Sequence, residues 1–351
     1  MATVMTGAPR TSTLVAATNR APRWKPLILV AGLAALALIV TFVRPDFELV
    51  YLAKAVSYAV AILGLNIVVG FSGQFSLAQG AFTGLGAYTA AILVADYGWH
   101  ILATIPVAAL LGFGVGCLLG LPALRVKGHY LATMTLGVAI VFPMVIKRYS
   151  DFTGGANGKL ALVDFSSPVS FLTTTQWRFL VICAIAALCF LFVRNIVRSR
   201  IGRAMAMSRS NEAGALSNGI AVPQSRVLAF GYAGLFGAVA GPLLVMMLEI
   251  AGPDDYSLMF TILLTTGLIV GGTSRLMGAL LGGLVIALLP SLTASIVSGP
   301  QANILYAVLL IGMIFILPGG LASLPTVVMN KWRKWSQRKK STDPVVSADL
   351  S

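Results

Sequence analysis

Charged side chains are scarce in this sequence of 351 residues: only 10% are Asp, Glu, Lys or Arg. Histidine occurs twice, as His100 and His129, and neither has a partner at the spacing of a catalytic triad, a metal site or a proton relay. The sequence also lacks a glycine-rich phosphate loop ending in Lys and Ser or Thr. We therefore expect no catalytic residues, no enzyme activity, and no ATP hydrolysis by this chain itself.

Cysteine is equally rare. Cys117, Cys183 and Cys189 all fall in apolar runs and lack the spacing of metal ligands. These observations argue against a zinc site and against a disulfide framework. We expect this chain to bind no metal and no cofactor.

Hydrophobic residues dominate instead. They make up 58% of the chain, and the mean hydropathy of +0.90 lies far outside the range of soluble domains. Apolar runs near the length of about 20 residues that crosses a bilayer recur along most of the sequence. The sequence therefore predicts an all-α, polytopic transmembrane helix bundle.

About ten spans can be placed in it, and eight to ten are compatible with the pattern because two runs are short. Their expected limits are 27–43, 50–70, 78–95, 101–121, 130–146, 177–193, 227–248, 258–270, 276–297 and 304–317. The short runs 258–270 and 304–317 are either half-helices that line a cavity or ordinary helices with misplaced ends.

The distribution of basic residues predicts the orientation, because Lys and Arg are retained on the cytoplasmic side of short loops. With ten spans and a cytoplasmic N-terminus, nineteen of the 25 basic residues fall inside, and eight of the 11 acidic residues, Asp46 to Asp255 except Glu212, fall outside. The nineteen are Arg10, Arg20, Arg23, Lys25, Arg125, Lys127, Arg194, Arg198, Arg200, Arg203, Arg209, Arg226, Arg275, Lys331, Arg333, Lys334, Arg338, Lys339 and Lys340. We expect both termini in the cytoplasm.

The same reading divides the chain into three parts. Residues 1–26 form a cytoplasmic segment, 27–320 the transmembrane domain with a long cytoplasmic loop at about 194–226, and 321–351 a basic cytoplasmic tail. This topology accounts for the net charge of +14, so nucleic acid is not an expected partner. The tail either rests against anionic lipid headgroups or is a simple stop-transfer anchor.

Uncharged polar groups interrupt the apolar stretch that runs from 64 to 95 without any charge. They are Asn66, Ser72, Gln74, Ser76 and Gln79. Such groups suit a pathway that passes a polar solute without holding it, in a broken helix that dips into the membrane. A tight interfacial turn explains them equally well.

The long cytoplasmic loop contains a helical pattern from about Gly202 to Ser217, stopped by Asn218 and Gly219 in the manner of a C-cap. A short helix in such a loop is either a docking element for a partner protein or a helix on the membrane surface. Elsewhere, glycines at four-residue spacing, as in Gly112 and Gly116, allow helix backbones to approach closely.

Five sequence blocks occur in the order of a known family. They are "GLNIVVGFSGQFSLAQGAFTGLGAYTAA", "LPALRVKGHYLATMTLG", "TGGANG", "SRIGRAMAMSRSNEAGALSNGI" and "GLIVGGTSRLMGALLGG". From about residue 60 to 320 the chain resembles the branched-chain amino acid ABC importer permeases, in the subfamily with the longer N-terminus. The resemblance implies a permease subunit in a bacterial cytoplasmic membrane that works by alternating access.

That resemblance also implies partners: a second, related permease, two cytoplasmic ATPase subunits that bind the ATP, and an external solute-binding protein. The "NEAG" segment would be the coupling helix, although Gly214 replaces a usual alanine and Gly219 comes one position late. The residues expected to couple the permease to its ATPases are Gly202, Arg203, Arg209, Asn211, Glu212, Ala213 and Gly219.

Other functions remain open at this point. Relatives of this permease shape also import urea, short amides, and aromatic or other small carboxylates. A lone ion-coupled carrier is less favoured, because such carriers place ionisable groups near the middle of the membrane and this chain has none there. A membrane scaffold without transport would leave the five ordered blocks unexplained.

Overall fold

The computed structural model describes residues 37–125, 129–167, 171–296, 301–317 and 319–324. The expected N-terminal segment 1–26, most of the span 27–43, Lys127 and most of the tail 321–351 lie outside these residues. Within the described residues the chain is helical apart from connecting segments and one ribbon of two residues per strand. The all-α prediction is confirmed.

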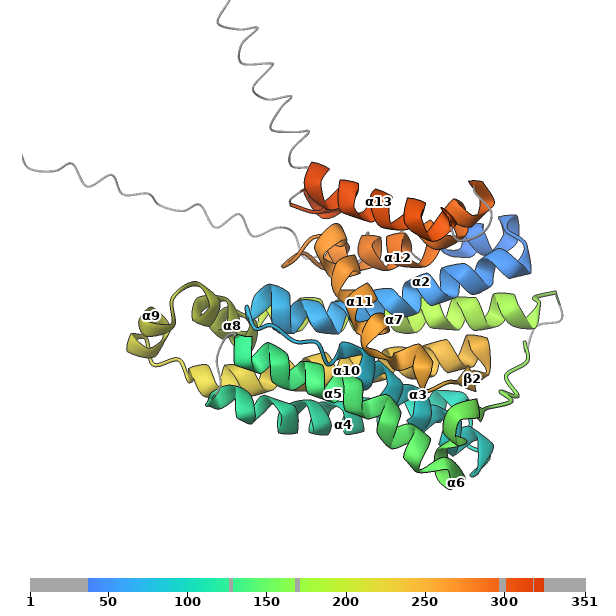
Figure 1. The fold of residues 1–351 in the computed structure, drawn as a ribbon, viewed down its shortest axis with the longest axis horizontal. Coiled ribbons are helices and arrows are strands. Elements are labelled where there is room, and N and C mark those ends of the chain that lie inside the picture. Colours follow the sequence, from blue (N-terminus) through green and yellow to red (C-terminus); the bar gives the residue numbers. More distant parts are fainter. Residues whose placement is uncertain (1–36, 126–128, 168–170, 297–300, 318, 325–351) are drawn as a thin grey trace, which may run out of the picture.

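Most of the long helices lie roughly parallel or antiparallel to one another, and α11 runs obliquely across them (Figure 1). Their bounds are α2 Asp46–Leu65, α3 Gln79–Ala95, α4 Ile101–Gly120, α5 His129–Arg148, α7 Thr174–Arg198, α10 Val222–Leu248, α11 Leu258–Gly271, α12 Leu276–Ile296 and α13 Gln301–Ile316. The shorter elements are the π-helical turn η1 Asn66–Phe71, α6 Ser150–Thr153, α8 Arg200–Ser210, α9 Glu212–Ser217, and the 3₁₀ turns η2 Pro122–Leu124, η3 Gly155–Asn157, η4 Asp254–Tyr256 and η5 Leu321–Ser323. Strand β1 Lys159–Leu160 pairs antiparallel with β2 Ile250–Ala251.

Each expected span from 50–70 onward coincides with one of these helices; the expected span 101–121, for example, is α4. Six described helices are long and apolar enough to cross a membrane. They are Asp46–Phe71, Ile101–Leu124, Tyr130–Arg148, Thr174–Arg198, Val222–Leu248 and Leu276–Ile296. Three more apolar helices are shorter: Gln79–Ala95, Leu258–Gly271 and Ile304–Phe315.

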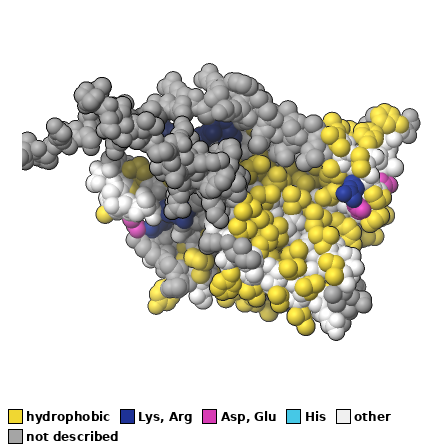
Figure 2. All heavy atoms as spheres, turned by 90° about the horizontal axis from the view of Figure 1, so that it is seen from above, with side chains coloured by type: hydrophobic (Ala, Val, Ile, Leu, Met, Phe, Trp, Pro, Cys, Tyr) yellow, Lys and Arg dark blue, Asp and Glu magenta, His cyan; other side chains and the backbone are white. Residues whose placement is uncertain are grey.

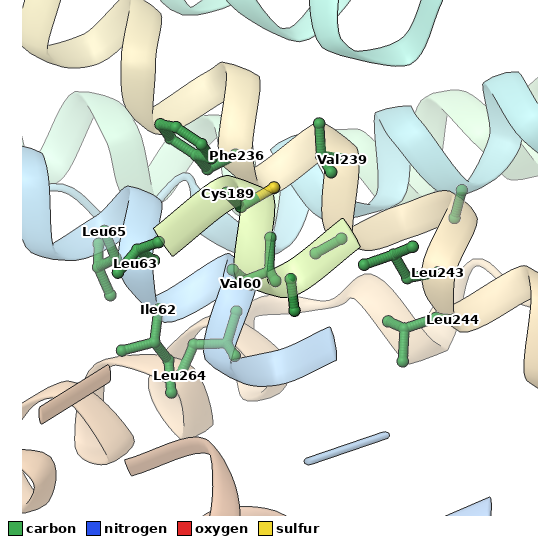
Figure 3. Close-up of a cluster of buried hydrophobic side chains, with 14 of the residues drawn as sticks. Val60, Ile62, Leu63, Leu65, Cys189, Phe236, Val239, Leu243, Leu244 and Leu264 are labelled. Atoms are coloured by element: carbon green, nitrogen blue, oxygen red, sulfur yellow. The ribbon is translucent and has the colours of Figure 1, made fainter. Parts of the chain in front are cut away.

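Helices α2 and α10 form the centre of the bundle. In their most apolar windows 72% and 78% of the residues are buried, against 22–28% in the other four long helices. Figure 3 shows Leu63 of α2 and Leu243 of α10 within one buried cluster that also takes in Cys189 of α7 and Leu264 of α11. Lipid tails are as apolar as these side chains, so close packing rather than escape from water holds such a core together.

Small residues bring α4 against α10. A side chain on Gly112 would collide with the backbone of Gly234, and one on Gly116 would collide with the carbonyl of Phe230. The predicted close approach at the four-residue glycine spacing is confirmed here. A larger residue at either position would force the two helices apart.

Two helices begin inside the bundle rather than at its ends. The side-chain amide of Gln79, the first residue of α3, donates to the carbonyls of Ala61 (2.8 Å) and Ala233 (3.3 Å), and Ala233 lies near the middle of α10. The next backbone N–H, that of Gly80, donates to the hydroxyl of Thr261 in the first turn of α11 (3.0 Å). The first turns of α3 and α11 therefore meet deep in the molecule.

The bundle has two different ends. In Figure 1, α8 and α9 extend from one end, while α6 and β2 lie at the other. Figure 2 shows hydrophobic side chains over much of the visible face between these ends, with charged side chains near the ends. An uncharged belt of this kind is what a surface in contact with lipid requires.

Candidate functional site

The long cytoplasmic loop of the prediction forms two helices instead of one. Helix α8 ends at Ser210, and α9 begins at Glu212. Asn211 between them is extended, with φ −156°, and its side-chain oxygen accepts from the backbone N–H of Gly214 (2.9 Å). The single predicted helix was wrong because an asparagine favours capping a new helix over continuing an old one.

The predicted end of this segment is confirmed. Asn218 is the C-cap of α9, and Gly219 follows with φ +72°, a left-handed conformation that glycine adopts without steric cost. Both small helices have a face turned to the bundle, on which Met205 of α8 and Ala215 of α9 are buried. The pair is therefore seated on the bundle.

An ion pair holds the α8–α9 pair against α10. The Glu212 carboxylate lies 2.9 Å from the guanidinium of Arg226 in the first turns of α10. Ser208 of α8 also lies 3.4 Å from Ser225, oxygen to oxygen. Of the other predicted coupling residues, Gly202 is buried against the end of α7, whereas Arg203, Ala213 and Gly219 are exposed.

Residues 72–78 connect η1 to α3 as a segment without regular secondary structure. Its side chains alternate between buried and exposed: Ser72, Gln74 and Ser76 are buried, while Phe75 is exposed. Because this segment leads from the end of η1 to the interior start of α3, it returns into the bundle. It is therefore not the tight turn that the sequence left open.

Protein groups satisfy much of the backbone of this returning segment. The N–H of Leu77 donates to the hydroxyl of Thr135 in α5 (3.0 Å), and the N–H of Gln74 donates to the carbonyl of Val68 (3.0 Å). A non-helical segment inside a membrane bundle requires such internal partners, because lipid offers none.

A cavity of about 350 Å³ lies between the returning segment and the α8–α9 pair. Its lining combines hydroxyl, amide, carboxylate and guanidinium groups from Ser72, Gln74, Ser208, Arg209, Glu212 and Arg226, together with Gly73, Phe75, Ala123 and Leu131. The Gln74 amide donates to Ser72 (2.6 Å), while its oxygen is buried without a hydrogen-bond partner among the described residues. The cavity thus brings two predicted pathway residues, Ser72 and Gln74, together with two predicted coupling residues, Arg209 and Glu212.

The other predicted pathway residues lie elsewhere. Gln79 is fully buried between α2 and α10, and Ser76 is buried in the returning segment. Asn66, also fully buried, uses both ends of its amide on a turn distant in sequence: it donates to the carbonyl of Arg275 (3.0 Å) and accepts from the N–H of Ser274 (2.8 Å).

Sequence reasoning missed Ser274 and Gly70. The guanidinium of Arg209 reaches both the Gly70 carbonyl and the Ser274 hydroxyl. Ser274 belongs to the fifth quoted block, but only the fold could reveal that it lies beside Gly70, 204 residues earlier.

Ion pairs gather at the opposite end of the bundle. Lys159 contacts Asp96 (2.6 Å), Arg178 contacts Glu249 (2.8 Å), and Lys147 contacts Asp254 (2.7 Å). Each pair connects the 147–178 region to another part of the chain: to Asp96 after α3, to Glu249 after α10, or to Asp254 in η4. Glu249 and Asp254 therefore have specific partners at this end.

Tyr256 of η4 is buried, edge-on to the rings of Tyr88 and Phe260. Burial, reinforced by the neighbouring Asp255 carboxylate, raises the pKa of Tyr256. Its phenol is neutral at physiological pH and contributes packing rather than charge to this region.

The chain matches a known family over most of the described bundle. Residues 49–317 match the family model described as the branched-chain amino acid transport system / permease component. The chain belongs to this permease family. The match runs from α2 to the end of α13, so it includes the returning segment, the cavity and the α8–α9 pair.

Individual members of the permease family are distant relatives. The high-affinity branched-chain amino acid transport system permease protein LivM of Escherichia coli is 27% identical over 252 residues, 65% of this chain and 59% of that protein. LivH of the same organism is 24% identical over 77% of this chain and 92% of its own length. The probable permease LivH of Methanocaldococcus jannaschii is 28% identical over 66% of this chain and 75% of its own length. The match to E. coli LivM thus covers less than two thirds of that relative, and no solved structure matches the chain.

Proposed function

We propose that this chain is the membrane-spanning permease subunit of an ATP-driven importer for branched-chain or related hydrophobic amino acids in a bacterial cytoplasmic membrane. The observation that carries the proposal is the match of residues 49–317 to the permease component of branched-chain amino acid transport systems. The names of the LivM and LivH relatives agree with this substrate class.

In this proposal the chain crosses the membrane ten times, with both termini in the cytoplasm. The separation of charge between the two ends of the bundle supports that topology. Among the described residues, the end that bears α8 and α9 carries one acidic residue, Glu212, and the basic residues Arg125, Arg194, Arg198, Arg200, Arg203, Arg209, Arg226 and Arg275. The other end carries eight described acidic residues, Asp46, Glu48, Asp96, Asp151, Asp164, Glu249, Asp254 and Asp255, against five basic ones, Arg44, Lys147, Arg148, Lys159 and Arg178.

The α8–α9 pair then docks with the partner ATPases, which bind the ATP; this chain holds no cofactor of its own. Exposed apolar side chains support the docking role: Met207 is 41% and Leu216 is 54% exposed, and Ala213 beside them is also exposed. Because Met205 and Ala215 are buried against the bundle, the pair has one face for each partner.

The solute would pass along uncharged polar groups in the bundle interior. Ser72 and Gln74 line the cavity at the cytoplasmic end, Ser76 lies further along the returning segment, and Gln79 is the first residue of α3. Asn66 braces the adjoining turn. Burial of Ser76 and Gln79 corresponds to a closed state, which alternating access requires at one stage of the cycle.

Uptake measurements test the proposed function. Cells that express the complete importer should accumulate radiolabelled leucine, isoleucine or valine faster than cells lacking this chain. A second related permease, two ATPases and an external binding protein complete the importer. Uptake should stop when ATP is depleted and persist when a protonophore removes the proton gradient. Accumulation of urea or acetamide instead would change the substrate, and uptake driven by the proton gradient alone would overturn the importer proposal.

A further inference from the structure

Arg209 of α8 links two turns that come from distant parts of the chain. Its guanidinium donates to the carbonyl of Gly70, at the end of η1, and to the hydroxyl of Ser274, between α11 and α12 (2.5 Å). The Ser274 hydroxyl in turn donates to the same Gly70 carbonyl (2.6 Å). The three groups form a closed triangle at the cytoplasmic end of the bundle.

The two turns are also joined without Arg209. The side-chain amide of Asn66 accepts from the N–H of Ser274 and donates to the carbonyl of Arg275. It thus satisfies the backbone of this turn in the way that a neighbouring β-strand would. Ser274 has φ +62°, a conformation that costs energy for a residue other than glycine and persists where its surroundings fix it. The 70–73 and 272–275 turns therefore behave as one unit, to which Arg209 connects α8.

A glycine makes room for the arginine stem. Gly73 has φ +71°, and a Cβ built on it would lie 2.7 Å from Cγ of Arg209. The turn also overlaps the end of η1, a π-helical segment, and such segments concentrate at functional positions. The stem of Arg209 thus lies on backbone that has no side chain, directly after an irregular stretch of helix.

We propose that Arg209 is the positioning residue that transmits displacement of the α8–α9 pair to the 70–73 and 272–275 turns together, a role that rests on the proposed importer function. Ser274 and Asn66 complete the link. When the ATPases move the pair, the guanidinium carries both turns with it, and the adjoining returning segment 72–78 changes its position at the cavity. Both bonds of Arg209 come from one terminal nitrogen, Nη1, whose two N–H groups lie in the rigid guanidinium plane and therefore hold the two acceptors in a fixed geometry. A lysine ammonium is instead a point charge on a flexible stem.

The link contributes little to folding, because Arg209 is exposed and exposed charge contacts add little stability. Loss of the guanidinium should therefore uncouple the importer rather than unfold it. Arg209→Met preserves an apolar stem, and Arg200→Met removes an exposed arginine from the same helix as a matched control.

The test measures leucine uptake and ATP hydrolysis by the complete importer in proteoliposomes. We expect Arg209→Met to assemble and to hydrolyse ATP within twofold of wild type, while leucine imported per ATP falls at least tenfold; Arg200→Met should keep the wild-type ratio. An unchanged ratio in Arg209→Met overturns the link. If that variant fails to assemble, Ser274→Ala decides: its ratio should fall about threefold, and an unchanged ratio overturns the link.

A second measurement separates this proposal from the importer proposal. Spin labels are placed at the exposed positions Ser217 of α9 and Thr273 of the α11–α12 turn, in a full-length chain without its three cysteines. The distance distribution should be narrow in the parent and in Arg200→Met, and broad in Arg209→Met. Distance distributions of equal width in the parent and in Arg209→Met overturn the role of Arg209, even if the chain is an importer subunit. A wild-type complex that imports no leucine with ATP refutes the importer proposal. In that case the distance distributions still test the role of Arg209.

Discussion

The backbone N–H of Gly80 donates a 3.0 Å hydrogen bond to the hydroxyl of Thr261, 181 residues further along the chain. This bond joins the first turn of α3 to the first turn of α11. The N–H groups at the start of a helix have no partner within it, so a start inside a membrane bundle needs an acceptor from elsewhere. Thr261 supplies one of these acceptors.

Replacing Thr261 by Val should therefore destabilise the protein. The change keeps the shape of the side chain and leaves the buried Gly80 N–H without its acceptor, at a cost of about 1–3 kcal/mol. Thermal unfolding of the purified protein in detergent measures the loss. Thr266→Val is the control, because the Thr266 hydroxyl bonds a carbonyl of its own helix, that of Ile262. Equal melting temperatures for the two variants would contradict the role given to Thr261.

Gly73→Ala should lower uptake several-fold, because the new methyl group displaces the stem of Arg209. Gly98→Ala is the matched control: Gly98 also has positive φ, +63°, but no atom lies within 4 Å of the added Cβ. Both variants bear the left-handed backbone penalty of about 1–2 kcal/mol. Combining Gly73→Ala with Arg209→Met should add little to the loss of uptake, since both changes break the same contact. Losses that simply add would show that Gly73 acts by another route.

Proline distinguishes two neighbouring positions in α9. The N–H of Ala215 bonds the carbonyl of Asn211 (3.0 Å), whereas Ala213 lies in the first turn, where proline is tolerated. Ala215→Pro should cost about 3 kcal/mol locally and abolish co-purification of the ATPases. Ala213→Pro should retain much of it. Retention of the ATPases by both variants would exclude α9 as the docking helix.

Two glutamines should respond differently to replacement by leucine. Gln79→Leu removes the bonds to Ala61 and Ala233 and should lower both thermal stability and uptake. Gln74→Leu should lower uptake with little effect on stability, because Gln74 lines the cavity and its amide bonds the adjacent Ser72. Gln301→Leu, at an exposed position, is the control. Wild-type uptake in both Gln74→Leu and Gln79→Leu would remove these residues from the pathway.

Cysteine labelling in whole cells tests the topology. A cysteine at Ser210, exposed at the end of α8, should react only with reagents that enter the cytoplasm. One at Ser150, exposed at the opposite end of the bundle, should react with an impermeant reagent added outside. The reverse pattern would invert the proposed orientation.

Hydropathy predicted the helices because a run of apolar residues specifies length directly. Hydropathy could not predict how deep in the bundle a helix begins. The run 258–270 looked short, and only the contact between Thr261 and Gly80 places the start of α11 inside the bundle. The break at Asn211 has a local signal, because asparagine is a strong N-cap residue and directly precedes Glu212; the prediction of one continuous helix overlooked it.

The candidate site was predictable only in part. Blocks of sequence indicated Gln74 and Glu212, yet no pattern within either block indicates that both line one cavity. The partners of Asn66 lie 208 and 209 residues away, so pairing them requires the fold. Local chemistry can be read from a single sequence, whereas contacts between distant turns cannot.

The two ends of the bundle should differ in their response to ionic strength. The Lys147–Asp254 and Lys159–Asp96 pairs hold the 147–178 region by charge, and Asp254 is 75% exposed. Dissolved salt weakens such ion pairs where solvent reaches them. The neutral amide of Asn66, buried against the backbone of Ser274, is indifferent to salt. A rise in external salt would therefore loosen the outer connections first and leave the bond between the inner turns as it was.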